Sequence, residues 1–134
     1  MTNEILDLHQ NVAEQKHKIS PMNVIDNPNP KMDTEVEHIL YLPELCPASK
    51  NPKQGSFITL RYKNSNHFLE LFSLDKHIDS YIGHTIVRDM EYFVQTIAQA
   101  AADVLKETVT ASAKIDYNLI RQCQKIYVVA KPSI

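Results

Sequence analysis

The chain has no tryptophan, and only two of its 134 residues are glycine. Phosphate-binding loops of the GxGxxG and Walker types need closely spaced glycines, because the backbone must approach the phosphate groups. Gly55 and Gly83 are too far apart for either pattern. A nucleotide-like ligand would therefore have to bind on a platform other than a Rossmann or P-loop fold.

Long apolar runs and cysteines are also scarce. No apolar run approaches the roughly 20 residues of a membrane-spanning helix, and the N-terminus lacks the apolar block of a signal peptide. We therefore expect Cys46 and Cys123, the two cysteines, to be free thiols. A net charge of −2 gives no support for a nucleic-acid platform or a polybasic anchor. We expect a soluble, cytoplasmic protein with no direct DNA binding and no membrane attachment.

The composition is that of one globular domain, with 43% hydrophobic and 22% charged residues. Residues 1–35 are polar, and the Asn-Pro repeat in "DNPNP" disfavours helix there. We expect this segment to be a short helix and a partly flexible arm that lies in part against a neighbouring subunit. Residues 36–134 are assigned to a single domain.

Alternating apolar residues predict strands on both sides of a helical region. "HILYLPEL" predicts an edge strand that ends at Pro43, and "SFITLRYK" places Ile58, Leu60 and Tyr62 on one core-facing side. "NSN" and "HFLELFSL" complete a predicted β-hairpin over roughly residues 56–73. "TVTASAKIDY" and "QKIYVVAKP" predict two further strands at the C-terminal end.

Two helices are predicted between the strand pairs. "SLDKHIDSYIG" predicts a helix with Ser73 as N-cap and Gly83 as its stop. "VRDMEYFVQTIAQAAADVLKE" predicts a longer helix by its i, i+3, i+4, i+7 spacing of apolar residues. The order ββ–αα–ββ predicts an α+β fold, a four-stranded antiparallel sheet with both helices on one face. Because such a sheet has two exposed edges, we predict a ring-forming homo-oligomer with its site between subunits.

Cys46, in "ELCPASKNPKQGSF", is the first candidate site residue. As an attacking thiolate it would be held in a stiff turn at the mouth of a strand, with Lys50 and Lys53 close enough to lower its pKa. As a packing residue it would be a small buried hydrophobe, which spacing alone favours. A zinc site is the weaker alternative, because no CxxC or CxxH surrounds it.

Four further side chains are candidates from their positions. Glu91 near the start of the long helix would accept two hydrogen bonds from the N–H/NH2 edge of a guanine or pterin ring, or is an ordinary acid favoured at a helix N-terminus. Glu70 is a ligand contact if it points inward, and a solvated residue if it does not. His77 and His84 lie near the helix pair and are candidate acid–base groups.

In their order and spacing, three segments resemble those of the tunnelling-fold superfamily. The closest similarity is to its NADPH-dependent 7-cyano-7-deazaguanine reductases, and GTP cyclohydrolase I is more distant. "CPASKNPKQGSFITLRY" is similar to the cysteine loop and following strand of the reductases, "LELFSLDKH" to their Glu-[Ser/Leu]-Lys-Ser-Leu-Lys-x-Tyr segment, and "RDMEYFVQTIAQ" to the start of their long helix. The resemblance covers roughly residues 37–131.

The resemblance implies a tunnelling fold, with sheets joined into an intersubunit barrel, stacked rings and sites at subunit interfaces. It implies that Cys46 adds to a substrate nitrile to give a thioimide, which two hydride transfers from NADPH reduce to the amine, in the queuosine branch of tRNA modification. Glu91 falls on the glutamate that anchors the purine edge. Glu70 and Ser73 fall on the Glu and Ser of the middle segment.

Several positions depart from the reductase pattern. Lys53 stands where the reductases carry the Asp that donates a proton, and Met90 replaces the His before the helix glutamate. Phe72 and Asp75 replace the two lysines that fit the NADPH site. Three alternatives therefore stay open: a non-reducing, amidine-forming relative, a cyclohydrolase-like pterin enzyme, and a ring protein that binds a purine or pterin without chemistry. The missing Cys-x-x-His pair argues against the cyclohydrolase, and no metal site is predicted.

Overall fold

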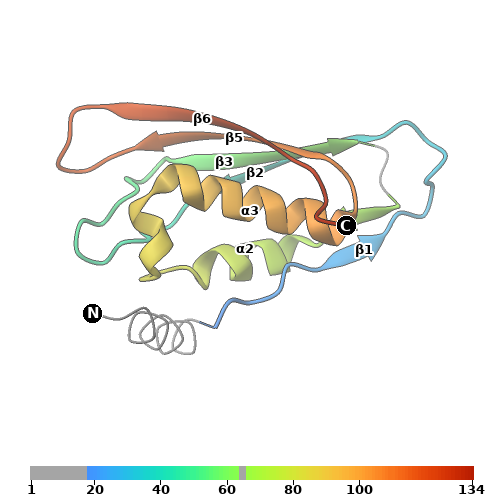
Figure 1. The fold of residues 1–134 in the computed structure, drawn as a ribbon, viewed down its shortest axis with the longest axis horizontal. Coiled ribbons are helices and arrows are strands. Elements are labelled where there is room, and N and C mark those ends of the chain that lie inside the picture. Colours follow the sequence, from blue (N-terminus) through green and yellow to red (C-terminus); the bar gives the residue numbers. More distant parts are fainter. Residues whose placement is uncertain (1–17, 64–65) are drawn as a thin grey trace.

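The computed structural model of the chain describes residues 18–63 and 66–134. Along the chain, four of the described strands come before a helical region and two come after it (Figure 1). In chain order the elements are β1 (Val24–Asp26), β2 (Glu35–Tyr41), β3 (Phe57–Lys63), β4 (His67–Leu69), α2 (Leu71–Asp79), the 3₁₀ helix η1 (Thr85–Arg88), α3 (Met90–Leu105), β5 (Val109–Asp116) and β6 (Cys123–Ala130).

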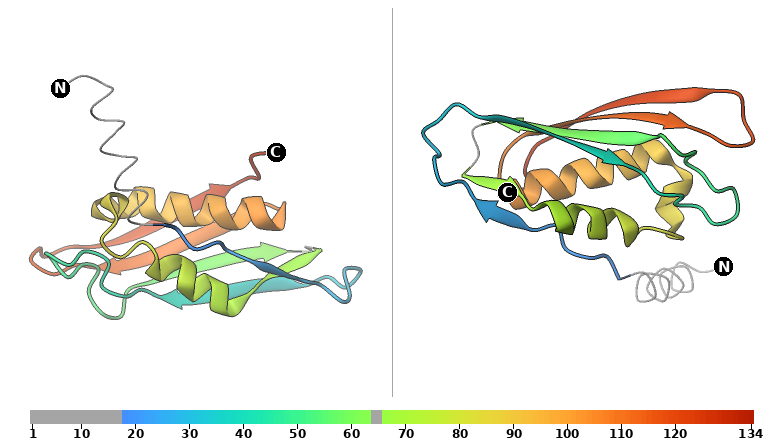
Figure 2. Two further views of the ribbon diagram at one scale, coloured as in Figure 1. Left: turned by 90° about the horizontal axis from the view of Figure 1, so that it is seen from below. Right: turned by 180° about the vertical axis from the view of Figure 1, so that it is seen from behind.

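Four of the strands form an antiparallel sheet in the order β2-β3-β5-β6. The central strands β3 and β5 place Phe57 opposite Lys114 and Arg61 opposite Thr110. Helices α2 and α3 lie on the same face of this sheet (Figures 1 and 2). The predicted α+β class and the four-stranded antiparallel sheet are therefore confirmed, and β2 is an edge strand as expected.

The core lies between this sheet and the helices. Side chains alternate between the two faces of a strand, so Ile58, Leu60 and Tyr62 all point toward the helices and are at most 3% exposed. The buried stripe of α3 comprises Met90, Phe93, Val94, Ile97, Ala98, Ala101, Ala102 and Leu105. Full burial of one large aliphatic or aromatic side chain stabilises a fold by about 1.5–3 kcal/mol. This interface therefore holds the two layers together.

The predicted hairpin over residues 56–73 is wrong. β4 pairs with β1 rather than with β3, and Val24 lies opposite Leu69 in a separate two-stranded sheet. Both edges of β3 are occupied, one by β2 and the other by β5, so no backbone groups are left there for β4. The small sheet lies beside the start of α2, at one end of the molecule (Figure 1).

Helix α2 begins earlier and ends earlier than predicted. Its N-cap is Glu70 rather than Ser73: the Glu70 carboxylate accepts the N–H groups of Phe72 at 2.6 Å and Ser73 at 2.9 Å. The helix ends at Asp79, so Ile82, which belongs to the predicted helix, lies beyond it and is 41% exposed. The predicted stop, Gly83, follows with a φ of 81°, a left-handed conformation that glycine adopts without steric cost.

Helix α3 confirms the predicted long helix. The side chain of Asp89 caps its N-terminus by accepting the Tyr92 N–H at 3.1 Å. Its C-cap is Lys106, whose φ of 58° is left-handed although the residue is not glycine. The cap N–H of Lys106 still donates to Ala102 O at 2.8 Å, which closes the last turn.

Part of the predicted N-terminal arm lies against its own domain. Residues 1–17 are outside the described residues, so the short helix expected there stays a prediction. From residue 18 onward the segment is tied down: Met22 is 5% exposed, the Asn23 N–H donates to Ser73 Oγ at 2.9 Å, and His77 Nδ1 lies 2.7 Å from Ser20 O. A contact between this arm and a neighbouring subunit stays a prediction as well.

Candidate functional site

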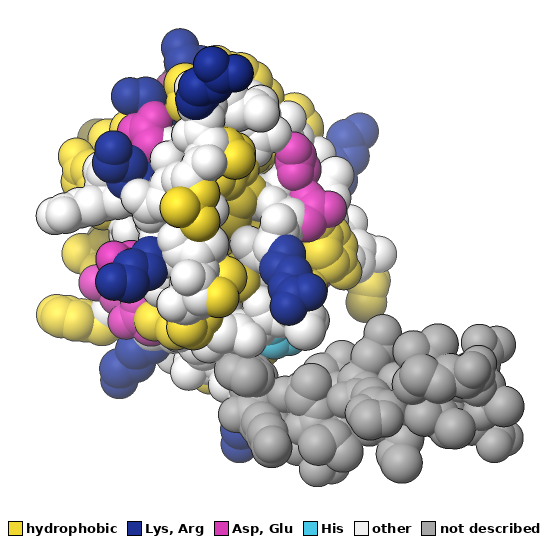
Figure 3. Space-filling model, turned by 90° about the vertical axis from the view of Figure 1, so that its left-hand side faces the viewer, with side chains coloured by type: hydrophobic (Ala, Val, Ile, Leu, Met, Phe, Trp, Pro, Cys, Tyr) yellow, Lys and Arg dark blue, Asp and Glu magenta, His cyan; other side chains and the backbone are white. Residues whose placement is uncertain are grey.

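Three connecting segments meet at the end of the sheet where α3 begins. They are the loop between β2 and β3, the segment that leads into α3, and the turn between β5 and β6 (Figure 1). We call this region, residues 42–56, 84–91 and 117–122, the loop end. Figure 3 looks onto it and shows basic side chains spread around hydrophobic and uncharged atoms.

Four predicted site residues belong to the loop end and two do not. Cys46, Lys53, His84 and Glu91 all come from its segments. Glu70 and Ser73 instead lie where β4 meets α2, near the opposite end of the molecule. In one chain, the structure therefore separates the residues that resemble the middle segment of the reductases from the others.

Cys46 opens a tight turn at the loop end. Its N–H donates to Asn51 O at 2.9 Å, and its carbonyl oxygen accepts the Lys50 N–H at 2.8 Å. Lys50 itself has a left-handed φ of 60°. The Cys46 side chain is half-buried and packs beside the core, so its sulfur projects from a backbone that hydrogen bonds hold on both sides.

Hydrogen-bond donors surround the Cys46 sulfur. The pKa of the Cys46 thiol lies below its ordinary value of 9.0, and the main cause is a hydrogen bond from the Ser49 hydroxyl. Hydrogen bonds from the backbone N–H groups of Ser49 and Ala48 lower this pKa further. Partial burial opposes this shift, and the charge of Arg88 adds a smaller lowering. Because the thiolate is the nucleophilic form of cysteine, this turn favours reactivity over inert packing.

The Cys46 loop is fastened to the end of β5. The Lys53 N–H donates to Asp116 O at 2.8 Å, and the Asn118 N–H donates to Asn51 Oδ1 at 2.6 Å. Buried Ser56 donates its hydroxyl to Lys53 O at 2.7 Å, and its oxygen accepts the Asp116 N–H at 2.9 Å. These bonds fix the position of the loop relative to the strand that leads into Tyr117.

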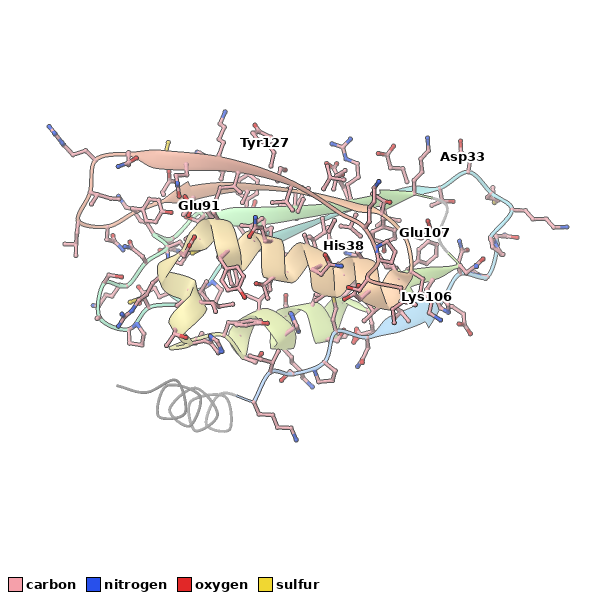
Figure 4. The ribbon with its side chains drawn as sticks, viewed as in Figure 1. Asp33, His38, Glu91, Lys106, Glu107 and Tyr127 are labelled. Carbon is pink, nitrogen blue, oxygen red and sulfur yellow. The ribbon has the colours of Figure 1, made fainter. Side chains whose placement is uncertain are left out.

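Glu91 is exposed on the first turn of α3 and is bonded to the sheet. Gln124 Nε2 of β6 donates to Glu91 Oε1 at 2.5 Å, and the Tyr117 hydroxyl donates to Gln124 Oε1. Burial raises the pKa of the Tyr117 phenol, and the charges of Glu91 and Asp89 raise it further, so the hydroxyl keeps its proton. Figure 4 shows Glu91 at the start of α3, below the strands.

Lys53 and Tyr117 share a surface hollow of about 340 Å³. Its other lining residues are Gln54, Asp116, Ile120, Arg121, Gln122 and Cys123. Cys46 does not line this hollow. Within one chain the structure therefore places Lys53 in the same hollow as Tyr117, which bonds Gln124, but it does not bring the thiol of Cys46 into that hollow.

Glu70, Ser73 and His84 have structural partners. The Glu70 carboxylate caps α2, and the Ser73 hydroxyl donates to Glu70 O at 2.9 Å. His84 Nδ1 accepts the Ile86 N–H at 3.2 Å and caps η1, and its ring packs edge-on against Tyr81. A role in catalysis would require each of these polar atoms to leave or share its present contact.

Sequence reasoning did not identify Ser49, Arg88, Tyr117 and Gln124 as site residues. Ser49 could have been found, because a serine three residues after a cysteine can reach its sulfur across one turn. Gln124 and Tyr117 meet Glu91 only through the pairing of β5 with β6 and the packing of α3 on the sheet. No local pattern signals such a contact.

Among the described residues, no three histidine, cysteine or acidic side chains are grouped so that they could hold a metal ion. In the same part of the chain, no helix has the length and apolar character needed to span a membrane. Searches against protein-family models and against curated proteins give no match to the chain.

Proposed function

We propose that the protein binds a flat purine-like ring and that Cys46 adds to a nitrile carbon on that ring to form a thioimide. The observation that carries this proposal is the Cys46 turn, in which Ser49 and Ala48 stabilise a thiolate at the loop end from which Glu91 also projects. In the step, the sulfur–carbon bond forms, one π bond of the nitrile breaks, and its electron pair moves to nitrogen, which takes a proton. Lys53 is the candidate source of that proton.

Glu91 supplies the recognition chemistry. A carboxylate accepts hydrogen bonds at both oxygens, so it matches a ring edge that carries an N–H beside an NH2 group. Glu91 is exposed, and a ligand can reach it without displacing core side chains. Charge-assisted hydrogen bonds of this kind are roughly twice as strong as neutral ones, which makes one carboxylate an effective anchor for a small ring.

The proposal includes a tunnelling fold and a ring of subunits. Among the described strands, β2 and β6 each pair on one side only, and they run antiparallel to each other within the sheet. An edge β2 of one copy beside an edge β6 of the next would therefore continue an antiparallel sheet. The sheet face opposite the helices carries exposed apolar side chains that such closure would cover: Ile39, Tyr41, Tyr127 and Val129.

The acidic edge charges have a partner within one chain. Glu35 and Glu37 of β2 lie 3.6 Å and 3.7 Å from the Arg61 guanidinium of β3, and Lys125 of β6 lies at the level of Tyr41, at the other end of β2. A ring is therefore favoured by the pairing of unlike edges, because β2 of one copy beside β6 of the next generates a ring rather than a closed pair.

The segment that resembles the cofactor segment of the reductases does not fit a dinucleotide phosphate. Asp75 and Asp79 place two carboxylates on the exposed side of α2, and Phe72 is 78% exposed where the reductases carry a lysine. The Glu70 carboxylate is committed to the helix cap. The exposed side of α2 carries Lys76 against these two carboxylates, so its balance stays acidic and disfavours a phosphate, and we derive no hydride step from this structure.

This mismatch favours a second candidate outcome for the thioimide. A nitrogen nucleophile such as ammonia attacks the thioimide carbon, the Cys46 thiolate leaves, and the product is an amidine. No electrons are gained or lost in this route, so it needs no reductant. Reduction to the amine with NADPH, the outcome that the resemblance implies, would require cofactor contacts from residues outside this segment.

Mass spectrometry of the intact protein tests the covalent step. Incubation with 7-cyano-7-deazaguanine is expected to add the mass of one ligand per chain, and Cys46→Ala is expected to abolish the adduct. Cys123→Ala is the matched control, because it removes the other, more exposed thiol. An adduct that survives in Cys46→Ala, or no adduct on the unmodified protein, would contradict the proposal. Loss of NADPH absorbance then separates reduction from amidine formation.

Native mass spectrometry or light scattering tests the ring. We expect a multimer at micromolar concentration, and Tyr127→Glu is expected to shift it toward the monomer because it places a charge on the face that closure would bury. Asp33→Glu keeps its charge at a site outside the edge strands and should leave the number of subunits unchanged. A monomeric unmodified protein would overturn the assembly and leave the adduct test unaffected.

A further inference from the structure

Glu91 would be a poor anchor if its side chain were mobile. An exposed glutamate has three side-chain torsions, and freezing them on binding costs free energy that weakens the complex. Here the side chain is held before any ligand arrives. Gln124 Nε2 donates to Glu91 Oε1 at 2.5 Å, and this bond ties the first turn of α3 to β6.

The direction of this contact is set by a second one. A glutamine side chain can turn its amide over and present either an acceptor or a donor to its neighbour. The Tyr117 hydroxyl donates to Gln124 Oε1, which places the NH2 group on the side of Glu91. The phenol is suited to this role because burial and the nearby carboxylates of Glu91 and Asp89 raise its pKa.

We call the two hydrogen bonds from Tyr117 to Gln124 and from Gln124 to Glu91 the relay. The relay leaves some acceptor sites of the Glu91 carboxylate unused. A carboxylate has about four lone-pair sites, and Gln124 occupies one of them on Oε1. The neighbouring acid Asp89 accepts the Tyr92 N–H as the cap of α3, and a side-chain hydrogen bond with Glu91 helps to lower the pKa of Asp89. The acceptor sites that the contacts with Gln124 and Asp89 leave on Glu91 are the ones open to a ring edge.

We infer that Gln124, itself oriented by Tyr117, is a positioning residue that presets Glu91 for a ring edge with two adjacent hydrogen-bond donors. The inference rests on the proposed function for the identity of the ring. It assigns to Gln124 and Tyr117 the selection of rings with an N–H/NH2 edge over rings that lack the NH2 group. Neither residue needs to touch the ligand.

The binding test uses 7-deazaguanine, which has the N–H/NH2 edge but no nitrile, and 7-deazahypoxanthine, which lacks the NH2 group. Gln124→Leu is expected to weaken 7-deazaguanine binding about tenfold and to narrow the preference between the two rings. Tyr117→Phe should weaken it less, because the Gln124 amide stays in place. Gln99→Leu is the matched control, since this glutamine lies eight residues further along α3, outside the loop end, and donates to Asp103 and Lys131 O, so its loss should leave the affinity unchanged.

A pH profile separates positioning from general structural damage. In Gln124→Glu two carboxylates face each other, so affinity should be low at alkaline pH and should recover on acidification, when one shared proton restores a hydrogen bond. Gln124→Leu has no such proton and should not recover. Equal affinity of Gln124→Leu and the unmodified protein, or a flat profile for Gln124→Glu, would overturn the inference.

A ligand-free measurement distinguishes this inference from the proposed function. In an NMR spectrum of the whole chain, the Gln124 side-chain NH2 signal, assigned by its loss in Gln124→Leu, should be shifted and protected from water exchange, and Glu91→Gln should abolish both effects. If these effects appear and 7-deazaguanine does not bind, the relay stands and the proposed function fails. If the ring binds and the signal is that of a free amide, the positioning role fails.

Discussion

The Tyr62 hydroxyl accepts the Leu69 amide N–H at 2.9 Å and so joins the central strand β3 to the small β1–β4 sheet. The same oxygen lies 2.9 Å from Nε2 of His38, and Tyr62 is only 3% exposed. Tyr62→Phe is expected to lower the free energy of unfolding by about 1–3 kcal/mol, because it leaves a buried N–H without an acceptor. Urea denaturation measures this loss.

Tyr127→Phe is the control for that experiment. Tyr127 is 76% exposed within one chain and points away from the helices (Figure 4), and phenylalanine keeps the aromatic ring that the proposed closure would cover. Loss of the hydroxyl should change the free energy of unfolding by less than about 0.5 kcal/mol. If both variants lose the same amount, the link between Tyr62 and Leu69 contributes nothing measurable.

Ser49→Ala is expected to make the Cys46 thiol less reactive at neutral pH. The Ser49 hydroxyl is the main cause of the lowered thiol pKa, so its removal should raise that pKa and move the alkylation profile to higher pH. Iodoacetamide alkylation in a Cys123→Ala background measures the midpoint for Cys46 alone. Ser112→Ala, on β5, should leave the midpoint unchanged, and an unchanged midpoint in Ser49→Ala would refute the assignment.

Stability is expected to fall as the pH falls below about 6.5. Burial lowers the pKa of His77, although its hydrogen bond to Ser20 O opposes the shift, and burial lowers the pKa of His38 as well. In the unfolded chain both rings bind protons near their ordinary value of 6.5, while the folded rings stay neutral. The unfolded state therefore binds more protons in this window, and the folded state loses stability down to the lower pKa values.

His77→Asn tests the contribution of that one ring. Asparagine keeps an N–H donor for Ser20 O but does not titrate, so the slope of unfolding free energy against pH should become shallower. Denaturation curves between about pH 5 and pH 8 measure this slope. Asp89 and Asp103 have pKa values lowered from 3.8, so their contributions are lost in a more acidic range. The same slope in both proteins would exclude His77 as a source.

Lys106→Gly is expected to stabilise the protein by about 0.5–1 kcal/mol. A side chain in the left-handed region, where Lys106 lies, costs roughly 1–2 kcal/mol, and glycine avoids this cost. Glycine also gives the unfolded chain more conformational entropy, which offsets part of the stabilisation. Lys106→Ala removes the same charge but keeps a Cβ, so it should not stabilise. Thermal unfolding of both variants measures the difference. A gain shared by both would mean that charge, not backbone conformation, is responsible.

Periodicity predicted the elements that bury one continuous face. The spacing of apolar residues identified α3, and the alternation at Ile58, Leu60 and Tyr62 identified the inner face of β3. Both patterns are local consequences of helix and strand geometry, and they do not depend on which element packs against them. The fold class followed from the order of these elements along the chain.

Pairing and capping were harder to predict. The 56–73 hairpin failed because the choice of partner for β4 depends on which edges of β3 are already taken, and this is a property of the whole sheet. Ser73 looked like the cap of α2, but Glu70 reaches the same N–H groups with a longer side chain. The bond between Gln124 and Glu91 joins a strand to a helix far apart in sequence, so only the packed layers reveal it.

The pairing of Phe57 with Lys114 at the midline of the sheet has a kinetic consequence. These strands can meet only after the chain has closed a loop that contains both helices, whereas β5 and β6 are joined by a short turn. Longer loops cost more entropy to close, so the midline is expected to form late during folding. During synthesis on the ribosome, one edge of β3 therefore stays unpaired until β5 emerges. Because an unpaired strand edge can pair with another chain, the nascent chain is most prone to aggregate in this interval.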